Sequence, residues 1–157
     1  MTPEHQQLIN RIRASAAAIQ QAVAALPPAL RAAPAKSGEW SARQILLHTR
    51  DVAMLAYGLR IRRLLYETDP TFTSYEEDAY RAANPGDSDS IDDIVHMLAA
   101  EHDLVAHILT ALPDGAWQHS GRSPDGNART IEYFAQRFVA HAEEHAAQLA
   151  ALNATAR

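Results

Sequence analysis

Two histidines four residues apart, His141 and His145, are the strongest candidates for chemistry in this sequence. On a helix, residues with this spacing lie one above the other, with Cβ atoms ~5–6 Å apart. Both imidazoles can therefore reach one divalent ion, because zinc–nitrogen bonds are about 2.0–2.1 Å long. A third ligand must come from another helix, and His48 is the best placed because it falls within an apolar helical stripe. The pattern predicts a metal site made of these three histidines.

The chemistry of that site follows from its ligands. Three neutral imidazoles without a thiolate suit Zn²⁺, Ni²⁺ or Fe²⁺. Three protein ligands leave a coordination position for water or substrate, as catalytic zinc sites do and structural ones do not. The alternative is that each histidine is a core-edge residue whose ring bonds to a backbone carbonyl. The chain has no cysteine, which excludes disulfides, thiolate nucleophiles and sulfur-ligated zinc.

The other five histidines fall into two groups. His102 lies in an apolar stripe and is interpreted as a core residue. The alternatives for it are a fourth ligand or a residue that orients a ligand. The remaining four lie outside the apolar stripes and are predicted to face water: His5, His96, His107 and His119.

Several charged residues lie near these histidines in the sequence. Asp51 and Glu144 are candidates to accept a hydrogen bond from a ligand imidazole, with a surface position as the alternative. The acidic run at residues 76–78 is predicted to be a solvated loop. A cluster of three arginines is interpreted as a solvated helix end, where cations favour the helix dipole, with an anion site as the alternative: Arg60, Arg62 and Arg63.

Two metalloenzyme motifs are disfavoured. Residues 141–145 match the H-x-x-E-H string of inverted zinc proteases. Those enzymes need a further acidic ligand downstream, and no Asp or Glu follows His145. A di-iron carboxylate bundle needs Glu-x-x-His pairs, and no glutamate of this chain has a histidine three residues later.

Four helices are predicted to position these residues, because apolar side chains recur at steps of three and four. Proline ends the first helix at Pro27-Pro28 and the second at Asp69-Pro70. Ser41 and Gln44 fit a capping box, and Ser90 or a neighbour caps the third helix. No strand and no internal repeat is predicted. The apolar stripes cover residues 8–26, 45–59, 91–112 and 131–152.

The connections differ in length. A linker leads to Trp40, and residues 67–89 form a long acidic connection with a short helix predicted from Tyr75 to Ala83. A loop is predicted after Pro113, with Trp117 closing one end of the core. These elements predict an all-α four-helix bundle.

Composition agrees with one globular domain over residues 1–157. The chain is 47% apolar and 21% charged, both near globular averages. Its formal net charge of −5 argues against a general nucleic-acid partner. No stretch reaches the ~18 consecutive apolar residues of a membrane span. We therefore expect a cytoplasmic protein with neither nucleic acid nor membrane as partner.

Residues 38–48 resemble the start of the second helix in the DinB/YfiT-like superfamily, where a W-[ST]-x₂-[EQ]-x₃-H pattern supplies a metal-binding histidine. Residues 130–149 are similar to that family's last helix, with its H-x₃-H pair and H-x₂-Q-[LI] ending. Residues 69–78 are similar to the loop after its second helix. The resemblance implies metal ligands at His48 and at the later pair. It also implies up-down-down-up order, with the long connection between the second and third helices.

The resemblance also implies a class of function. Family members of known activity include metal-dependent transferases that use low-molecular-weight thiols, and a thiol-dependent isomerase in a related branch. Many members have no assigned reaction. We therefore expect a small-molecule substrate, and either a thiol-cofactor-dependent transferase or a metal-assisted hydrolase. The alternative is a non-catalytic stress-response or ligand-binding protein whose metal is structural or regulatory.

Some apolar residues lie off the main stripes of the second and third helices. Such positions either broaden the core or form a separate contact surface. Because symmetric dimers are the commonest soluble assemblies, a homodimer through these two helices is predicted. The residues concerned are Leu46, Leu47, Met54, Met97 and Ile108.

Overall fold

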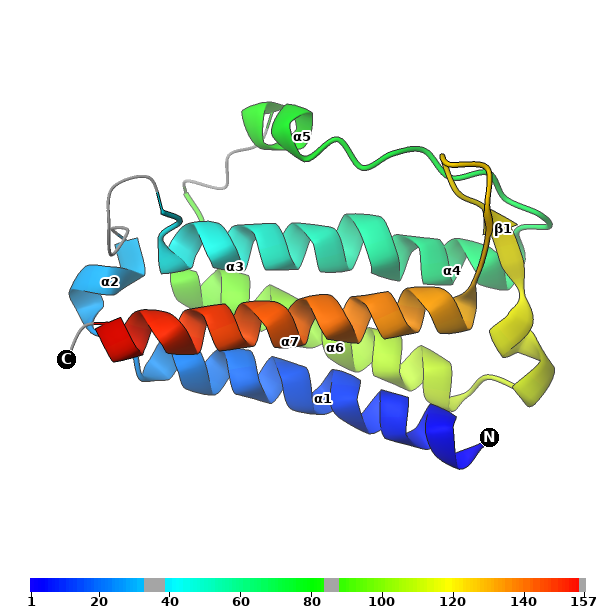
Figure 1. The fold of residues 1–157 in the computed structure, drawn as a ribbon, viewed down its shortest axis with the longest axis horizontal. Coiled ribbons are helices and arrows are strands. Elements are labelled where there is room, and N and C mark those ends of the chain that lie inside the picture. The colour runs from blue at the N-terminus through cyan, green and yellow to red at the C-terminus, as the bar shows by residue number, and fades with distance from the viewer. Residues whose placement is uncertain (33–38, 84–87, 156–157) are drawn as a thin grey trace.

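Four long helical stretches dominate the computed structural model, which describes residues 1–32, 39–83 and 88–155 (Figure 1). The predicted four-helix bundle is confirmed. In Figure 1, α1 and α7 run from right to left, and the second and third stretches run from left to right. The stretches are α1 (Pro3–Ala24), α3–η1–α4 (Ala42–Asp51, Val52–Gly58, Leu59–Tyr66), α6 (Ile91–Thr110) and α7 (Ile131–Thr155).

Side-chain caps fix where three of these helices begin. The Thr2 hydroxyl accepts a hydrogen bond from the backbone N–H of His5 at the start of α1. The predicted capping box of α3 is confirmed: the Ser41 hydroxyl accepts from the Gln44 N–H, and the Gln44 side chain accepts from the Ser41 N–H. Ser90 caps α6 as predicted. These caps satisfy N–H groups that have no partner within the helix.

The second long stretch is not a uniform α-helix. Its middle, η1, is a π-helix, in which the Leu59 N–H bonds to the Met54 carbonyl five residues back. Hydrophobic spacing alone does not separate this segment from an α-helix, and it was not predicted. π-Helical turns are rare and often lie at functional sites.

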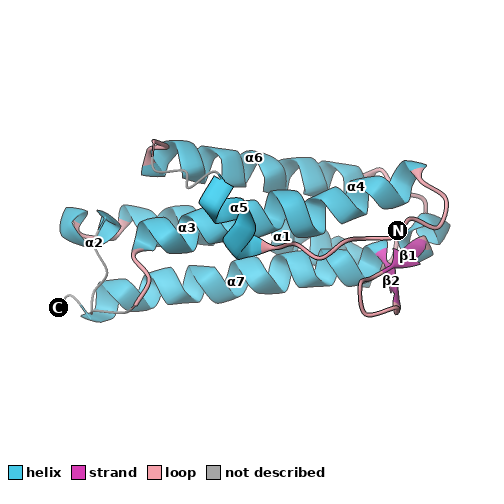
Figure 2. Cartoon of the chain, turned by 90° about the horizontal axis from the view of Figure 1, so that it is seen from above, coloured by secondary structure: helices cyan, strands magenta, loops and turns pink. Residues whose placement is uncertain are grey.

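Short helices interrupt two of the connections. The linker after α1 begins with α2 (Pro28–Ala32), which was not predicted, and residues 33–38 of that linker lie outside the described residues. The short helix predicted after α4 is confirmed as α5 (Glu77–Ala83), and residues 84–87 lie outside the described ranges. In Figures 1 and 2, α5 and the segment leading to it lie over the second long stretch.

A small hairpin contradicts the prediction that the chain has no strand. After the 3₁₀-helix η2 (Asp114–Gln118), β1 (Ser120–Arg122) pairs antiparallel with β2 (Ala128–Thr130). Arg122 also exchanges backbone hydrogen bonds with Pro70 and Phe72 at 2.8 Å each. Three-residue strands hold too few positions to show a strand's alternation, so the hairpin could be found only through its tertiary contacts.

Trp117 closes one end of the core, as predicted. Its side chain is fully buried and stacks on the His5 ring with 3.8 Å between ring centroids. The prediction that His5 faces water is therefore wrong. The indole of η2 covers the imidazole, and a pattern confined to the first helix does not show this contact.

The apolar residues that suggested a dimer are partly used within the chain. Leu46 and Leu47 are buried in the core, and Ile108 packs against it. These residues broaden the core and leave less apolar surface for a partner. Among the described residues, no helix is long and apolar enough to span a membrane.

Candidate metal centre

The three predicted histidines meet between two helices. His48 comes from α3, and His141 and His145 come from successive turns of α7. The His141 Nε2 atom lies 3.0 Å from Nε2 of His48 and 3.2 Å from Nε2 of His145. One ligand atom from each residue lies within 4.8 Å of the others. The trio is therefore close enough to hold one ion.

The outer nitrogens of two of these rings are held by side-chain oxygens. His48 Nδ1 lies 2.7 Å from Glu77 Oε1, and His145 Nδ1 lies 2.8 Å from Gln148 Oε1. A carboxylate or amide oxygen accepts hydrogen bonds, so each Nδ1 carries the ring proton. Each Nε2 then presents a lone pair to the centre of the trio. Outer partners of this kind orient metal-binding histidines.

The trio has too few N–H protons to pair all of its facing nitrogens with one another, and a bound cation would satisfy them. A neutral His141 can donate at most one N–H, yet its Nε2 faces two other Nε2 lone pairs at 3.0 and 3.2 Å. Three nitrogens each ~2.0–2.1 Å from one tetrahedral ion lie about 3.4 Å apart, close to the spacing seen here. A borderline divalent ion would engage all three lone pairs at once.

Burial and neighbouring charges keep two of these rings neutral, those of His141 and His145. Burial, helped by His145, His48 and Arg137, lowers the pKa of His141 to about 3. Burial also lowers the pKa of His145, although its bond to Gln148 opposes the shift. Because metal-binding imidazoles must be deprotonated, both shifts prepare the site for a cation near pH 7.

The trio opens on a cavity of about 700 Å³. His48 and His145 line it together with Glu144 and Trp40. Glu144 is exposed and, within the described residues, makes no hydrogen bond to an imidazole. The surface position, which was the alternative for this residue, is therefore the one that it takes, and its side chain lines the cavity.

Asp51, the other predicted outer acceptor, does not serve the histidines. It is buried and accepts a hydrogen bond from Arg50 at 2.8 Å. Arg50 also bonds to Asp89 at 2.6 Å. This buried network joins the end of α3 to the residues just before α6.

Glu77 is the functional side chain that sequence reasoning missed. Residues 76–78 were predicted to be solvated, but the Glu77 side chain is only 29% exposed and holds His48. The two residues are 29 positions apart, so no helical spacing rule relates them. The only available signal was the acidic start of the predicted short helix.

Most of the remaining histidines are buried or exposed as predicted. His102 is fully buried, bonds through Nδ1 to the Leu98 carbonyl at 2.8 Å, and is not a member of the trio. Its interpretation as a core residue is confirmed. The three that are exposed as predicted are His96, His107 and His119.

The arginines of α4 are not a merely solvated helix end. Arg62 pairs with buried Glu101 at 2.6 Å, although burial still raises the pKa of that carboxyl. Arg63 pairs with Glu67. Arg60 is half-buried and donates to the Thr73 carbonyl at 2.9 Å. The prediction therefore fails because tertiary partners surround this end of the helix.

The fold and the histidine centre together define a class of helical-bundle proteins. Residues 11–149 match the sequence model of the DinB superfamily. The chain belongs to this superfamily, and the resemblance in the sequence is confirmed.

The solved structures that are similar include one that matches nearly the whole chain. YfiT from Bacillus subtilis, described as a probable metal-dependent hydrolase with an unusual four-helix bundle topology, superposes with a TM-score of 0.84 and 23% identity. The match covers 97% of this chain and 87% of YfiT. No curated protein matches the sequence.

Proposed function

We propose that this protein is a metal-dependent hydrolase of a small molecule, with its ion held by His48, His141 and His145. The observation that carries the proposal is the convergence of three imidazole nitrogens at the edge of a cavity of about 700 Å³. Cavities of ~300–1,000 Å³ are typical of small-molecule sites. The description of YfiT as a probable metal-dependent hydrolase supports the same reading.

The residues around the trio have separable roles in this proposal. Glu77 and Gln148 fix the orientation of two ligand rings. When bound, a divalent ion supplies Lewis acidity that polarises a carbonyl or phosphoryl oxygen and makes water easier to deprotonate. Glu144 lines the same cavity, so its carboxylate is placed to accept a proton from an attacking water.

A thiol-dependent transferase is the second candidate. The same cavity has an apolar wall of Trp40, Ala151 and Leu152, which offers room for a second substrate beside the histidines. A purely structural metal is less well supported, because structural sites are closed by a fourth protein ligand. Here two of the three histidines line an open cavity.

The test begins with elemental analysis, for which we expect about one divalent ion per chain. The metal-loaded protein is then screened with esters, amides and phosphate esters, and with low-molecular-weight thiols plus electrophiles, each with and without a chelator. Chelator-sensitive turnover of a hydrolytic substrate supports the hydrolase. Turnover only in the presence of a thiol overturns hydrolysis in favour of transfer.

Glu144 gives a sharper test within the same assay. We expect Glu144→Gln to lower kcat by about 10²–10⁴-fold, the usual contribution of a positioned proton acceptor, while metal content stays constant. Glu143→Gln is the matched control, because the adjacent Glu143 pairs with exposed Arg11 outside the cavity. Equal activity of the two variants would remove Glu144 from the mechanism.

The cytoplasmic homodimer remains a prediction in this proposal. Light scattering at tens of micromolar measures the mass in solution. A mass near 17.2 kDa would contradict the dimer, and twice that mass would support it.

A further inference from the structure

Three guanidinium groups line a second cavity, of about 350 Å³, beside the histidine centre. Arg60 reaches it from α4, Arg129 from β2 and Arg137 from α7. Tyr57 of η1 and Tyr133 of α7 also line it. We call these five residues the arginine pocket. Four separate elements thus bring cations and phenol groups to one place.

The positive charge of the arginine pocket is only partly neutralised. Asp125 also lines the cavity and pairs with Arg129 at 2.9 Å. Within the described part of the chain, no carboxylate forms an ion pair with Arg60 or Arg137. A hydrogen bond with the Tyr57 side chain raises the pKa of Arg137. Two guanidinium groups therefore keep donors without an anionic partner.

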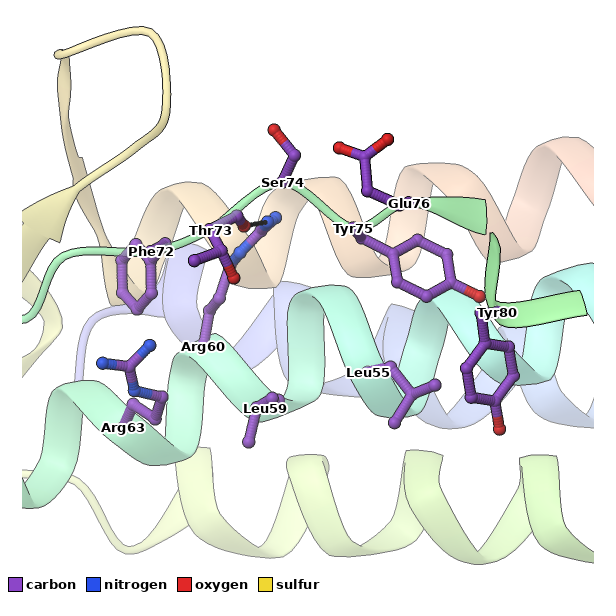
Figure 3. Close-up of a pocket in the computed structure, with 10 residues that line it drawn as sticks. All are labelled: Leu55, Leu59, Arg60, Arg63, Phe72, Thr73, Ser74, Tyr75, Glu76 and Tyr80. Carbon is purple, nitrogen blue, oxygen red and sulfur yellow. Dashed lines mark hydrogen bonds between the residues drawn. The ribbon is translucent and has the colours of Figure 1, made fainter. Parts of the chain in front are cut away.

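Arg60 is held in place by its surroundings. Its guanidinium lies 5.8 Å from the ring centroid of Phe72 and 5.6 Å from that of Phe134. Figure 3 shows Arg60 extending from α4 toward Phe72 and Thr73, on the wall of a separate cavity of about 340 Å³. Such stacking pre-organises the planar donor group and costs little entropy when a ligand binds.

The arginine pocket begins one helical turn from the predicted metal ligands. Tyr133, Arg137 and His141 follow at steps of four along α7, so they share one face of that helix. The Tyr57 ring packs edge-on against the His141 ring, with 5.9 Å between centroids. Beyond His141, the same helix carries His145 and Gln148, which line the larger cavity. The histidine centre therefore lies between two cavities.

We propose that the arginine pocket binds the oxyanion of an acidic substrate, a carboxylate or a phosphate, whose reacting group lies at the histidine centre. This inference rests on the proposed function and names its substrate class. Guanidinium groups match both oxyanions through paired N–H donors, and the tyrosine hydroxyls can donate further bonds. Arg137 and His141 are one helical turn apart, ~5.4 Å along α7, and the charge of Arg137 acts on His141, so the substrate that we propose is a small acidic molecule.

The test measures anion binding to the full-length protein with metal removed by a chelator, so that phosphate cannot bind to the ion. Inorganic phosphate and succinate are titrated separately, followed by amide chemical shifts. We expect saturable shifts at residues of the arginine pocket. Tighter binding of phosphate assigns a phosphate substrate, and tighter binding of succinate assigns a carboxylate. Absence of saturable binding by either anion overturns the proposal.

Matched variants locate the binding. Arg137 is exposed, so Arg137→Gln should leave the fold intact while weakening the anion about tenfold, because a charge-assisted bond is lost. Arg137→Lys should recover part of that loss. Arg11→Gln also removes an exposed arginine, one that pairs with Glu143, and should bind as the wild type does. Equal weakening in the Arg11 and Arg137 variants would show non-specific attraction and overturn the proposal.

The result of the anion titration does not depend on whether the protein binds a metal. If the protein takes up no metal but binds the anion through Arg137, the proposed function fails and the arginine pocket stands. If it takes up metal but no anion binds, only the arginine pocket fails. Tyr57→Phe provides a finer readout, with an expected loss of about two- to fivefold for one neutral hydrogen bond.

Discussion

His102 and the histidine trio are two histidine environments of the same bundle: His102 is fully buried, as His145 nearly is, whereas His48 and His141 are half-buried. All four side chains fall in the apolar stripe of a long helix. His102 bonds to Leu98 of its own helix, packs edge-on against Phe138, and has no hydrogen-bond partner for Nε2 among the described residues. In the trio, ring nitrogens from two helices face each other and two outer nitrogens are held by side chains.

The difference shows that neither burial nor stripe position identifies a metal ligand. A lone imidazole in apolar surroundings stays neutral, and burial lowers the pKa of His102 accordingly. Several lone pairs must converge, and their rings must be oriented, before a cation is favoured. The following predictions test this distinction, from the largest expected effect to the smallest.

The first prediction concerns the ligands themselves. We expect the double substitution His141→Ala plus His145→Ala to abolish metal uptake, because a single imidazole would be left. His102→Leu, which removes a buried histidine at similar volume, should retain about one ion per chain. Elemental analysis after incubation with micromolar Zn²⁺ or Ni²⁺ measures both. A double variant that binds as the wild type does would place the site elsewhere.

The second prediction concerns the orienting carboxylate. Glu77→Gln should weaken metal binding by about 10–100-fold, because ligand histidines depend on their outer partners. Glu76→Gln is the control, since this exposed neighbour carries the same charge change without touching His48. Competition with a coloured chelator measures the affinities. If both variants weaken equally, overall charge rather than orientation is responsible.

The third prediction concerns the amide partner of His145. Gln148→Ala removes a neutral acceptor and should weaken metal binding by only about two- to fivefold. Gln136→Ala, on the same helix and exposed, should have no effect. The chelator assay applies again. A loss as large as that of Glu77→Gln would mean that charge on the outer partner is unimportant.

The fourth prediction concerns the pH dependence contributed by His102. Its pKa is lowered in the folded protein, so below pH ~6.5 the unfolded chain binds more protons at this residue. The stability that neutral His102 contributes is therefore complete above this pH and is lost as the pH falls. Urea unfolding at several pH values should show a shallower loss for His102→Leu than for the wild type. Parallel curves would contradict the prediction.

The parts of the structure that sequence reasoning found are those with local signals. The capping box at Ser41 needs only four consecutive residues, and the pairing of His141 with His145 needs one helical turn. The parts that it missed depend on distant contacts. Glu77 reaches His48 from a separate short helix, and His5 is covered by the indole of Trp117. In both pairs, the two residues that touch are many helical turns apart in the sequence.

Gln148 is an intermediate case. It lies three residues after His145, so helical spacing places it on the same face. The H-x₂-Q ending drew attention to it only through the family resemblance. Physically, its role depends on the amide oxygen reaching Nδ1, which the choice of rotamer decides.

The π-helix η1 affects how many residues are needed to connect α3 to α4. Its bond from Leu59 back to Met54 encloses one residue more than an α-helical turn. A chain with one residue fewer between Asp51 and Leu59 could therefore form a continuous α-helix with both flanks in their present orientation. His48 on one side and Arg60 on the other would keep their helix faces, while Tyr57 would change position. In an alignment of related chains, a single-residue gap here would mark those without the π turn.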